Sequence, residues 1–272
     1  MRVIPFFGIL GVRMSDMNLL DCHNHTAEWS DGRQSIDQIL EKSRRMGVRV
    51  GLSDHAGTTD YLNSEDRLLA YADFLSQYPV ARGYETDLGR QVLVSKDVRS
   101  KFDYVIGSVH GMETETGPRQ SFRHLLDWTK GENPGFDPKA QFGDVEKLFK
   151  RHLDLVRREY DKQAFTILGH CSLLPPLALG DPETIYPEWW EDGLVEFLKT
   201  SGVFMEISNR WRTPYMRLMK KAVDAGVRFS AGSDGHEPER SCELDFPRQL
   251  IAEYQVPQDQ IFDVARLKEG HS

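Results

Sequence analysis

The chain has 272 residues, a formal net charge of -8 and 39% hydrophobic residues, which suits one large α/β barrel or two smaller domains. The acidic balance argues against a surface that coats nucleic acid, although bound metal ions could still attract small anionic substrates. Three cysteines without a CxxC spacing do not form a disulfide framework, and a reducing cytoplasm suits them best. The apolar stretch 3–10 is too short to span a bilayer, and residues 1–17 are expected to form a flexible extension.

Strand-like and helix-like segments alternate along the rest of the chain. Apolar runs bounded by glycine and polar residues predict seven buried strands, each followed by a helical segment. This strict alternation predicts a parallel sheet with crossover helices. The expected strands are 19–25, 48–54, 80–85, 103–109, 165–169, 203–207 and 227–232. The expected helices are 35–46, 64–78, 90–100, 144–160, 188–201, 214–225 and 247–253.

Two segments interrupt this alternation. Residues 111–143 are rich in glycine, proline and charge, and we expect an insertion-like loop there with a short helix around 122–129. Residues 172–187 form a second, proline-rich loop. Neither segment changes the overall composition, so residues 18–272 are predicted to form a single domain.

Histidines and carboxylates stand at or just past the ends of the apolar runs. In a closed or nearly closed barrel, the carboxyl ends of the strands meet at one mouth, so these side chains should converge. Each of them alone has an ordinary explanation, such as a turn aspartate for Asp31 or a satisfied core histidine for His110 and His170. The set as a whole is what predicts a metal centre. Its members are His23, His25, Asp31, His55, Glu85, His110, His170, Asp234 and His236.

Nine protein ligands are too many for a single ion, because zinc takes about four. The number therefore favours two or three divalent ions that share a bridging carboxylate. Nitrogen and oxygen ligands without thiolates suit zinc, manganese or iron. Asp54 could orient the ring of His55, and Asp21 could do the same for His23 or form a buried salt bridge. The remaining histidines, His124, His152 and His271, are expected at the surface.

The sixth expected strand supplies no histidine, and it continues into Glu206-Ile207-Ser208-Asn209-Arg210-Trp211-Arg212. By the same barrel argument this segment opens at the mouth. Arg210 and Arg212 are candidates to bind an anion, because a guanidinium matches phosphate oxygens bidentately, although ordinary surface arginines are an equal alternative. Glu206 is expected to be structural rather than a ligand.

Six ordered motifs carry a resemblance to a known family. They are His23-x-His25-Thr26 with Ser30-Asp31-Gly32, Asp54-His55, Gly83-x-Glu85, Gly107-Ser108-Val109-His110, Gly169-His170 and Ser233-Asp234-x-His236. Together they resemble the PHP (polymerase and histidinol phosphatase) family over roughly residues 19–236. The resemblance implies a distorted seven-stranded βα barrel, up to three metal ions and hydrolysis of phosphoesters.

Carried over position by position, the resemblance implies three ligand groups. One ion would take His23, His25, Glu85 and Asp234, a second would take Glu85, His110 and His170, and a third would take Asp31, His55 and His236. The segments Gly83–Asp87 and Asp103–His110 look most like the histidinol-phosphatase branch. The chain departs from that branch at Cys171-Ser172, where the branch has Pro-Asp, and in the segment after Glu206. Both departures concern the substrate pocket.

The sequence therefore predicts a metal-dependent phosphoesterase that hydrolyses a small phosphomonoester of the histidinol-phosphate type. A metal-bridging hydroxide would attack phosphorus in line, with Asp234, His236, Arg210 and Arg212 as catalytic groups. One alternative is a phosphodiesterase or nucleotide phosphatase acting on mononucleotides or short oligonucleotides. An alternative of another class is an inactive scaffold stabilised by metal. Neither a membrane nor a long nucleic acid is expected as a partner.

Overall fold

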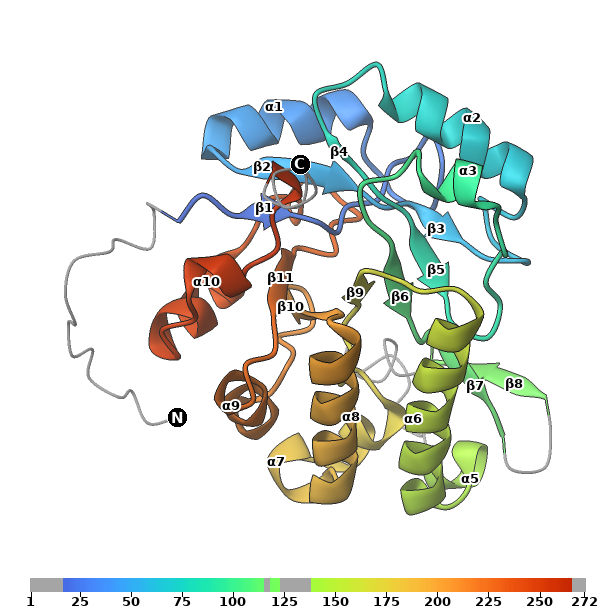
Figure 1. Cartoon of the computed structure of the whole chain (residues 1–272), viewed down its shortest axis with the longest axis vertical. Coiled ribbons are helices and arrows are strands. Elements are labelled where there is room, and N and C mark those ends of the chain that lie inside the picture. Colours follow the sequence, from blue (N-terminus) through green and yellow to red (C-terminus); the bar gives the residue numbers. More distant parts are fainter. Residues whose placement is uncertain (1–16, 115–117, 123–137, 266–272) are drawn as a thin grey trace.

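The protein consists of a curled parallel sheet surrounded by helices (Figure 1). It was obtained as a computed structural model that describes residues 17–114, 118–122 and 138–265. Within these ranges no helix is both long and apolar enough to cross a membrane. The predicted extension 1–17 lies outside the described residues, except for Met17.

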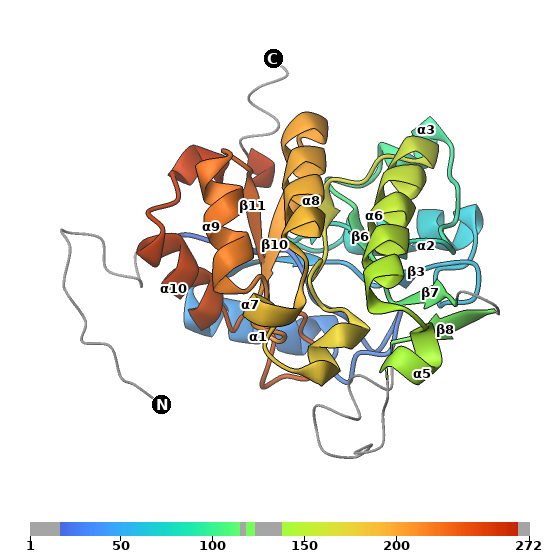
Figure 2. The ribbon, with the colours of Figure 1, turned by 90° about the horizontal axis from the view of Figure 1, so that it is seen from below.

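Nine short strands make up the sheet, in the order β3-β5-β6-β9-β10-β11-β1-β2-β4, and all their pairings are parallel. The helices lie outside the sheet (Figures 1 and 2). The strands are β1 (Leu20–Asp21), β2 (Arg49–Leu52), β3 (His55–Ala56), β4 (Ala81–Arg82), β5 (Glu85–Asp87), β6 (Ile106–Ser108), β9 (Ile167–Leu168), β10 (Phe204–Ser208) and β11 (Phe229–Gly232).

The predicted number of seven strands is wrong, because two of the expected strands are each divided in two. Two residues separate β2 from β3, and two separate β4 from β5. At the first break the backbone N–H of Asp54 donates to the hydroxyl of Tyr71 instead of to a neighbouring strand. The amide of Glu85 nevertheless donates to the carbonyl of Asp54, so the two chain segments stay side by side through the breaks. β3 follows β2 in the chain, and β2 pairs with β4. The two end strands of the order, β3 and β4, therefore lie close together, and the sheet is curled.

The helices agree with most of the expected positions. Ser64 caps the second helix as expected, since its hydroxyl accepts from the amide of Arg67, whereas the helix expected at 90–100 is much shorter. The α-helices are α1 (Ile36–Met46), α2 (Glu65–Leu75), α3 (Lys96–Arg99), α5 (Pro138–Phe142), α6 (Val145–Lys162), α7 (Pro182–Ile185), α8 (Glu188–Ser201), α9 (Met216–Asp224) and α10 (Asp245–Glu253). Two 3₁₀-helices, Pro175–Leu179 and Gln258–Gln260, complete the set within the described ranges.

The segment that was expected to be an irregular loop contains a β-hairpin. Its strands β7 (Gly111–Glu113) and β8 (Arg119–Ser121) pair antiparallel directly after β6. Phe122 lies in a turn after β8, and the rest of the helix expected at 122–129 lies outside the described residues. The proline-rich loop 172–187 contains a 3₁₀-helix and α7.

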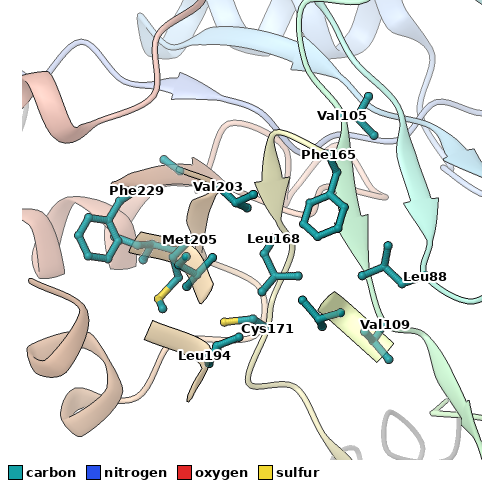
Figure 3. Close-up of a cluster of buried hydrophobic side chains, with 14 of the residues drawn as sticks. Leu88, Val105, Val109, Phe165, Leu168, Cys171, Leu194, Val203, Met205 and Phe229 are labelled. Atoms are coloured by element: carbon teal, nitrogen blue, oxygen red, sulfur yellow. The ribbon is translucent and has the colours of Figure 1, made fainter. Parts of the chain in front are cut away.

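Apolar side chains from the strands and the outer helices form a continuous core. Figure 3 shows Leu168 of β9, Met205 of β10, Phe229 of β11 and Leu194 of α8 in one cluster. Helices α6 and α8 stand side by side outside this cluster (Figure 2). Apolar burial of this kind is the main favourable contribution to folding.

His152 corrects one expectation, because it lies on α6 inside the core and not at the surface. Its side chain is 0% exposed, and its Nδ1 accepts the indole N–H of Trp190 at 3.2 Å. The apolar face of α6 carries it inward together with Leu148, Leu153 and Val156. Burial lowers the pKa of His152 to about 3, so the ring is neutral at physiological pH.

Candidate metal centre

The carboxylate of Glu85 lies at the centre of a cluster of imidazole rings. Glu85 begins β5 and its side chain is fully buried. Five rings lie within 4 Å of its two oxygens, which brings together ligands from strands that are distant in sequence. Oε1 lies 3.3 Å from Nε2 of each of His23, His110 and His170, whereas Oε2 lies 2.8 Å from Nδ1 of His55 and 3.6 Å from Nε2 of His25.

Asp234 approaches the same cluster from the end of β11. Its Oδ1 lies 3.5 Å from Nε2 of His25, 3.8 Å from Nε2 of His23 and 3.2 Å from Nδ1 of His236. Its backbone has a φ of 50°, a left-handed conformation that is unfavourable for an aspartate. Such strained positions cluster at functional sites, where the surrounding structure holds them.

Asp31 lies at the outer edge of the cluster. Its Oδ1 lies 3.5 Å from Nε2 of His55 and 3.4 Å from Nε2 of His236, and its side chain is 47% exposed. All nine residues that the sequence places in a metal centre are therefore brought together at the carboxyl ends of the strands. The number of strands differs from the prediction, but the ends of the strands meet as the barrel argument predicted.

The residues present fit divalent cations. Among the described residues, Nε2 of His23, Nε2 of His25 and both oxygens of Glu85 are buried without a hydrogen-bond partner. Leaving such an atom unsatisfied costs about 1–3 kcal/mol, and a bound cation would satisfy all four. Three sets of residues each offer ligand atoms that all lie within 4.8 Å of one another within the set. They are His25, Asp31, His55 and His236; His23, His25 and Glu85; and His55, Glu85 and His110.

The charges of the cluster are matched between acids and bases. Burial alone would raise the pKa of Glu85, but the neighbouring rings of His23, His110 and His55 hold it well below its usual range. Asp234 behaves in the same way beside His23 and His236. Both carboxylates are thus ionised, which is the form that binds a cation.

Arg210 and Arg212 lie in different surroundings, although the sequence predicts both equally as residues that bind an anion. Arg210 lines a cavity of about 210 Å³ above the cluster, and its Nη1 lies 2.6 Å from Nδ1 of His236. Arg212 is exposed, and its guanidinium lies 4.5 Å from the centre of the Phe246 ring instead of in the cavity. The structure brings only Arg210 to the predicted ligands.

The rest of the cavity wall comes from the β7–β8 hairpin and from the loops after β9 and β10. Phe122 and Trp211 line the cavity together with Val109 and Leu173. Trp211 also donates from its indole to Oδ2 of Asp234 at 2.5 Å. The cavity wall thus includes apolar and aromatic side chains, and one of these, Trp211, contacts the predicted ligand Asp234.

The expected roles of Asp21 and Asp54 are not those observed. Asp54 accepts from the backbone N–H and the hydroxyl of Thr26, at 2.7 and 2.9 Å, instead of orienting His55. Asp21 accepts the amides of Ser233 and Cys242 at 2.8 and 2.9 Å, so it joins chain segments, and it forms no salt bridge with another described residue. Both aspartates hold backbone in place beneath the ligands.

Glu206, which the sequence predicts to be structural rather than a ligand, contacts the cluster through His23. It lies in β10, is 1% exposed, and its Oε1 lies 2.6 Å from Nδ1 of His23. The available signal was a single charged residue inside an apolar strand, which needs a buried partner. The sixth strand therefore does reach the ligands, although it carries no histidine.

Comparison with known proteins finds one similar sequence and two similar folds. No protein-family model matches the chain. A protein of Deinococcus radiodurans described as "Probable histidinol-phosphatase" is 27% identical, and the match covers 61% of this chain and 61% of that protein. The chain thus spans about three fifths of the length of this relative.

Two solved structures share the fold. A Listeria monocytogenes protein assigned as the histidinol phosphatase HisK superposes with a TM-score of 0.63 and 17% identity, covering 82% of this chain and 97% of that chain. The Lactococcus lactis histidinol phosphate phosphatase, solved with zinc, L-histidinol and phosphate, gives a TM-score of 0.55 and 15% identity, covering 87% and 94%. In sequence and in fold, the chain resembles the histidinol phosphatases of the PHP family.

Proposed function

We propose that the protein is a metal-dependent phosphatase that hydrolyses a small phosphomonoester of the histidinol-phosphate type. The observation that carries this proposal is the convergence of nine ligand-type side chains in one cluster. Six of them line the cavity, and the other three are buried beside them with ligand atoms that lack hydrogen-bond partners. The relative from Deinococcus radiodurans and the zinc, L-histidinol and phosphate of the Lactococcus lactis structure support this class of substrate.

The ligand groups are those that the resemblance to the PHP family implies. We assign His23, His25, Glu85 and Asp234 to one ion, Glu85, His110 and His170 to a second, and Asp31, His55 and His236 to a third. Zinc, manganese and iron all suit this set, since it contains no thiolate. When bound, such ions supply a hydroxide for in-line attack on phosphorus and offset the charge that develops on the phosphate oxygens.

The chain itself binds and orients the phosphate. Arg210 is the one arginine or lysine among the described residues that line the cavity, and it can hold a phosphate oxygen beside His236. Phe122 and Trp211 would contact the alcohol part of the substrate and exclude water from that side. This division gives the phosphate a polar wall and the leaving alcohol an apolar one.

One assay separates this function from its alternatives. Protein loaded with zinc or manganese should hydrolyse histidinol phosphate faster than AMP, and a chromogenic phosphodiester slowest, with activity lost on chelation. A preference for AMP or the diester would favour the nucleotide phosphatase or phosphodiesterase alternative. Metal-loaded protein that hydrolyses none of the three would favour the inactive scaffold.

Two further expectations remain part of this proposal. The described cysteines are all free and buried, which agrees with a reducing cytoplasm as the site of action. We also propose that residues 18–272 form a single domain, in which the β7–β8 hairpin belongs to the insertion-like part 111–143.

A further inference from the structure

Glu206 has two carboxylate oxygens, and each holds a different part of the cluster. Oε1 lies 2.6 Å from Nδ1 of His23, and Oε2 accepts the backbone N–H of His170 at 2.6 Å. Both contacts are buried, and they connect residues assigned above to two different ions. Hydrogen bonds to an ionised acceptor away from water are among the stronger ones in proteins.

The contact with His23 determines which ring nitrogen of His23 is free to bind a cation. A carboxylate only accepts, so the proton of the neutral ring must be on Nδ1. The lone pair then lies on Nε2, which faces Glu85 Oε1 at 3.3 Å and Asp234 Oδ1 at 3.8 Å. An acceptor carboxylate also makes the ring a better ligand, because it stabilises positive charge on the imidazole.

The contact with His170 holds a strained backbone. His170 has a φ of 24°, well outside the favourable regions for a residue with a side chain. Such a conformation costs about 1–3 kcal/mol and persists only where neighbours hold it. The N–H of this residue is the group that Glu206 accepts, so the carboxylate stabilises the backbone that points the His170 ring at Glu85.

A close approach at Gly232 makes room for the carboxylate. A Cβ atom placed on Gly232 would lie 2.1 Å from Oε1 of Glu206 and 2.9 Å from Cβ of His23. Gly232 ends β11, which pairs with β10, so the space beside Glu206 is fixed by the sheet. Any side chain at this position would displace Glu206 from His23.

We propose that Glu206 is a positioning residue that orients His23 and His170 and thereby sets the metal affinity of two of the three ligand groups. This inference rests on the proposed metal centre but not on the substrate. Among the described residues, Glu206 makes no hydrogen bond or ion pair with Asp31, His55 or His236. Its removal should therefore weaken the groups that contain His23 and His170 and spare the third.

The test compares Glu206→Gln with Glu191→Gln in the full chain. Glu191 is an equally buried carboxylate that binds Tyr215 and Arg217 between α8 and α9, outside the metal centre. Zinc is titrated into metal-free protein in competition with a chromophoric chelator, and bound zinc is counted by mass spectrometry. We expect Glu206→Gln to bind up to two zinc ions about tenfold to hundredfold more weakly than wild type, and Glu191→Gln to match wild type.

A spectroscopic measurement and a second variant keep the test independent of stability. Cobalt(II) in place of zinc should show a changed d–d spectrum in Glu206→Gln and an unchanged one in Glu191→Gln. Gly232→Ala, which retains the carboxylate but displaces it, should weaken zinc in the same way. Glu206→Asp, with a shorter side chain, should recover part of the affinity if it reaches either partner.

The outcomes separate this inference from the proposed function. Equal zinc affinity in Glu206→Gln and Glu191→Gln, or equal weakening of all three ions, would overturn the positioning role. Wild-type protein that binds zinc but hydrolyses no phosphoester would contradict the proposed function and leave the positioning role intact. Wild-type protein that binds no zinc would contradict both.

Discussion

His23 and His152 are both fully buried, yet their surroundings differ in the feature that defines the candidate site. His23 faces Glu85, Asp234 and Glu206, and these carboxylates outweigh burial and raise its pKa well above the usual value. His152 lies among core side chains of α6 and α8, and burial alone lowers its pKa to about 3. The surroundings thus favour the charged form of His23 and the neutral form of His152.

The comparison shows that buried histidines alone do not mark a site. The core histidine accepts from one neutral donor, Trp190, whereas the rings of the metal centre lie within 4 Å of shared carboxylates. An unsatisfied ring nitrogen occurs in both regions. Carboxylates at the carboxyl ends of the strands therefore separate the metal centre from the core.

Replacing the central carboxylate should have the largest effect. Glu85→Gln retains the size of the side chain but removes the charge that five rings share. We expect kcat/KM for the phosphomonoester to fall at least about a thousandfold, which corresponds to about 4 kcal/mol. The control is Glu159→Gln, because Glu159 is a buried carboxylate that pairs with Lys162 on α6. Activity within tenfold of wild type would show that Glu85 is not central to the reaction.

The core histidine should make stability depend on pH. An unfolded histidine takes up its proton near pH 6.5, so the lowered pKa of His152 stabilises the fold above that value, and this stability is lost as the pH falls. The loss is about 1.4 kcal/mol per pH unit down to about pH 3. In His152→Gln the amide oxygen can still accept from Trp190, but the side chain does not titrate.

The measurement is urea unfolding of wild type and His152→Gln, both with chelator present. From pH 7 to pH 5, the free energy of unfolding of wild type should fall by about 2 kcal/mol relative to the variant. Ligand histidines titrate in both proteins and cancel in this difference. Parallel pH profiles would mean that His152 is not held neutral by the core.

Arg210 and Arg212 should differ in substrate binding. Arg210→Ala removes a charged donor from the cavity, which should raise KM for the phosphomonoester about tenfold to hundredfold. Arg212→Ala should raise KM much less, since its guanidinium lies over Phe246, and should lower stability by about 0.5–1 kcal/mol. Steady-state kinetics and thermal unfolding measure the two effects. Equal increases in KM would restore Arg212 to the binding site that its sequence position suggested.

The outer ligand should have the smallest effect. Asp31→Asn changes a side chain that is 47% exposed, so water can replace part of its contribution. We expect one ion fewer per chain by mass spectrometry and a loss of about tenfold in kcat/KM. Asp154→Asn, in an exposed pair with Lys150, is the control and should bind metal as wild type does. Loss of more than one ion would mean that Asp31 also supports the inner ligands.

The convergence of the ligands was predictable because strand periodicity and strand ends are local properties of a sequence. His23 and His25, two residues apart in an extended segment, both direct Nε2 towards Glu85, as their spacing implied. The sheet pairing then brings distant strand ends together without further information.

The contacts around the ligands were not predictable, because they depend on side chains that meet only through tertiary packing. Glu206 reaches His23 across 183 positions of sequence, and Asp54 binds Thr26 instead of its neighbour His55. Helical periodicity placed an apolar face on α6 correctly, but it did not identify His152 as part of that face. The division of one expected strand at Asp54 likewise involves a hydrogen bond to Tyr71 that the sequence does not reveal.

The strained backbones of His170 and Asp234 have a consequence for the life of the protein in a cell. Each would cost the fold about 1–3 kcal/mol, a large share of the 5–15 kcal/mol by which a typical domain is stable. Cations that bind only the folded chain would stabilise it by mass action and offset this cost. Metal starvation should then increase the unfolded fraction that proteases degrade, so that the abundance of the protein would follow the supply of its ions.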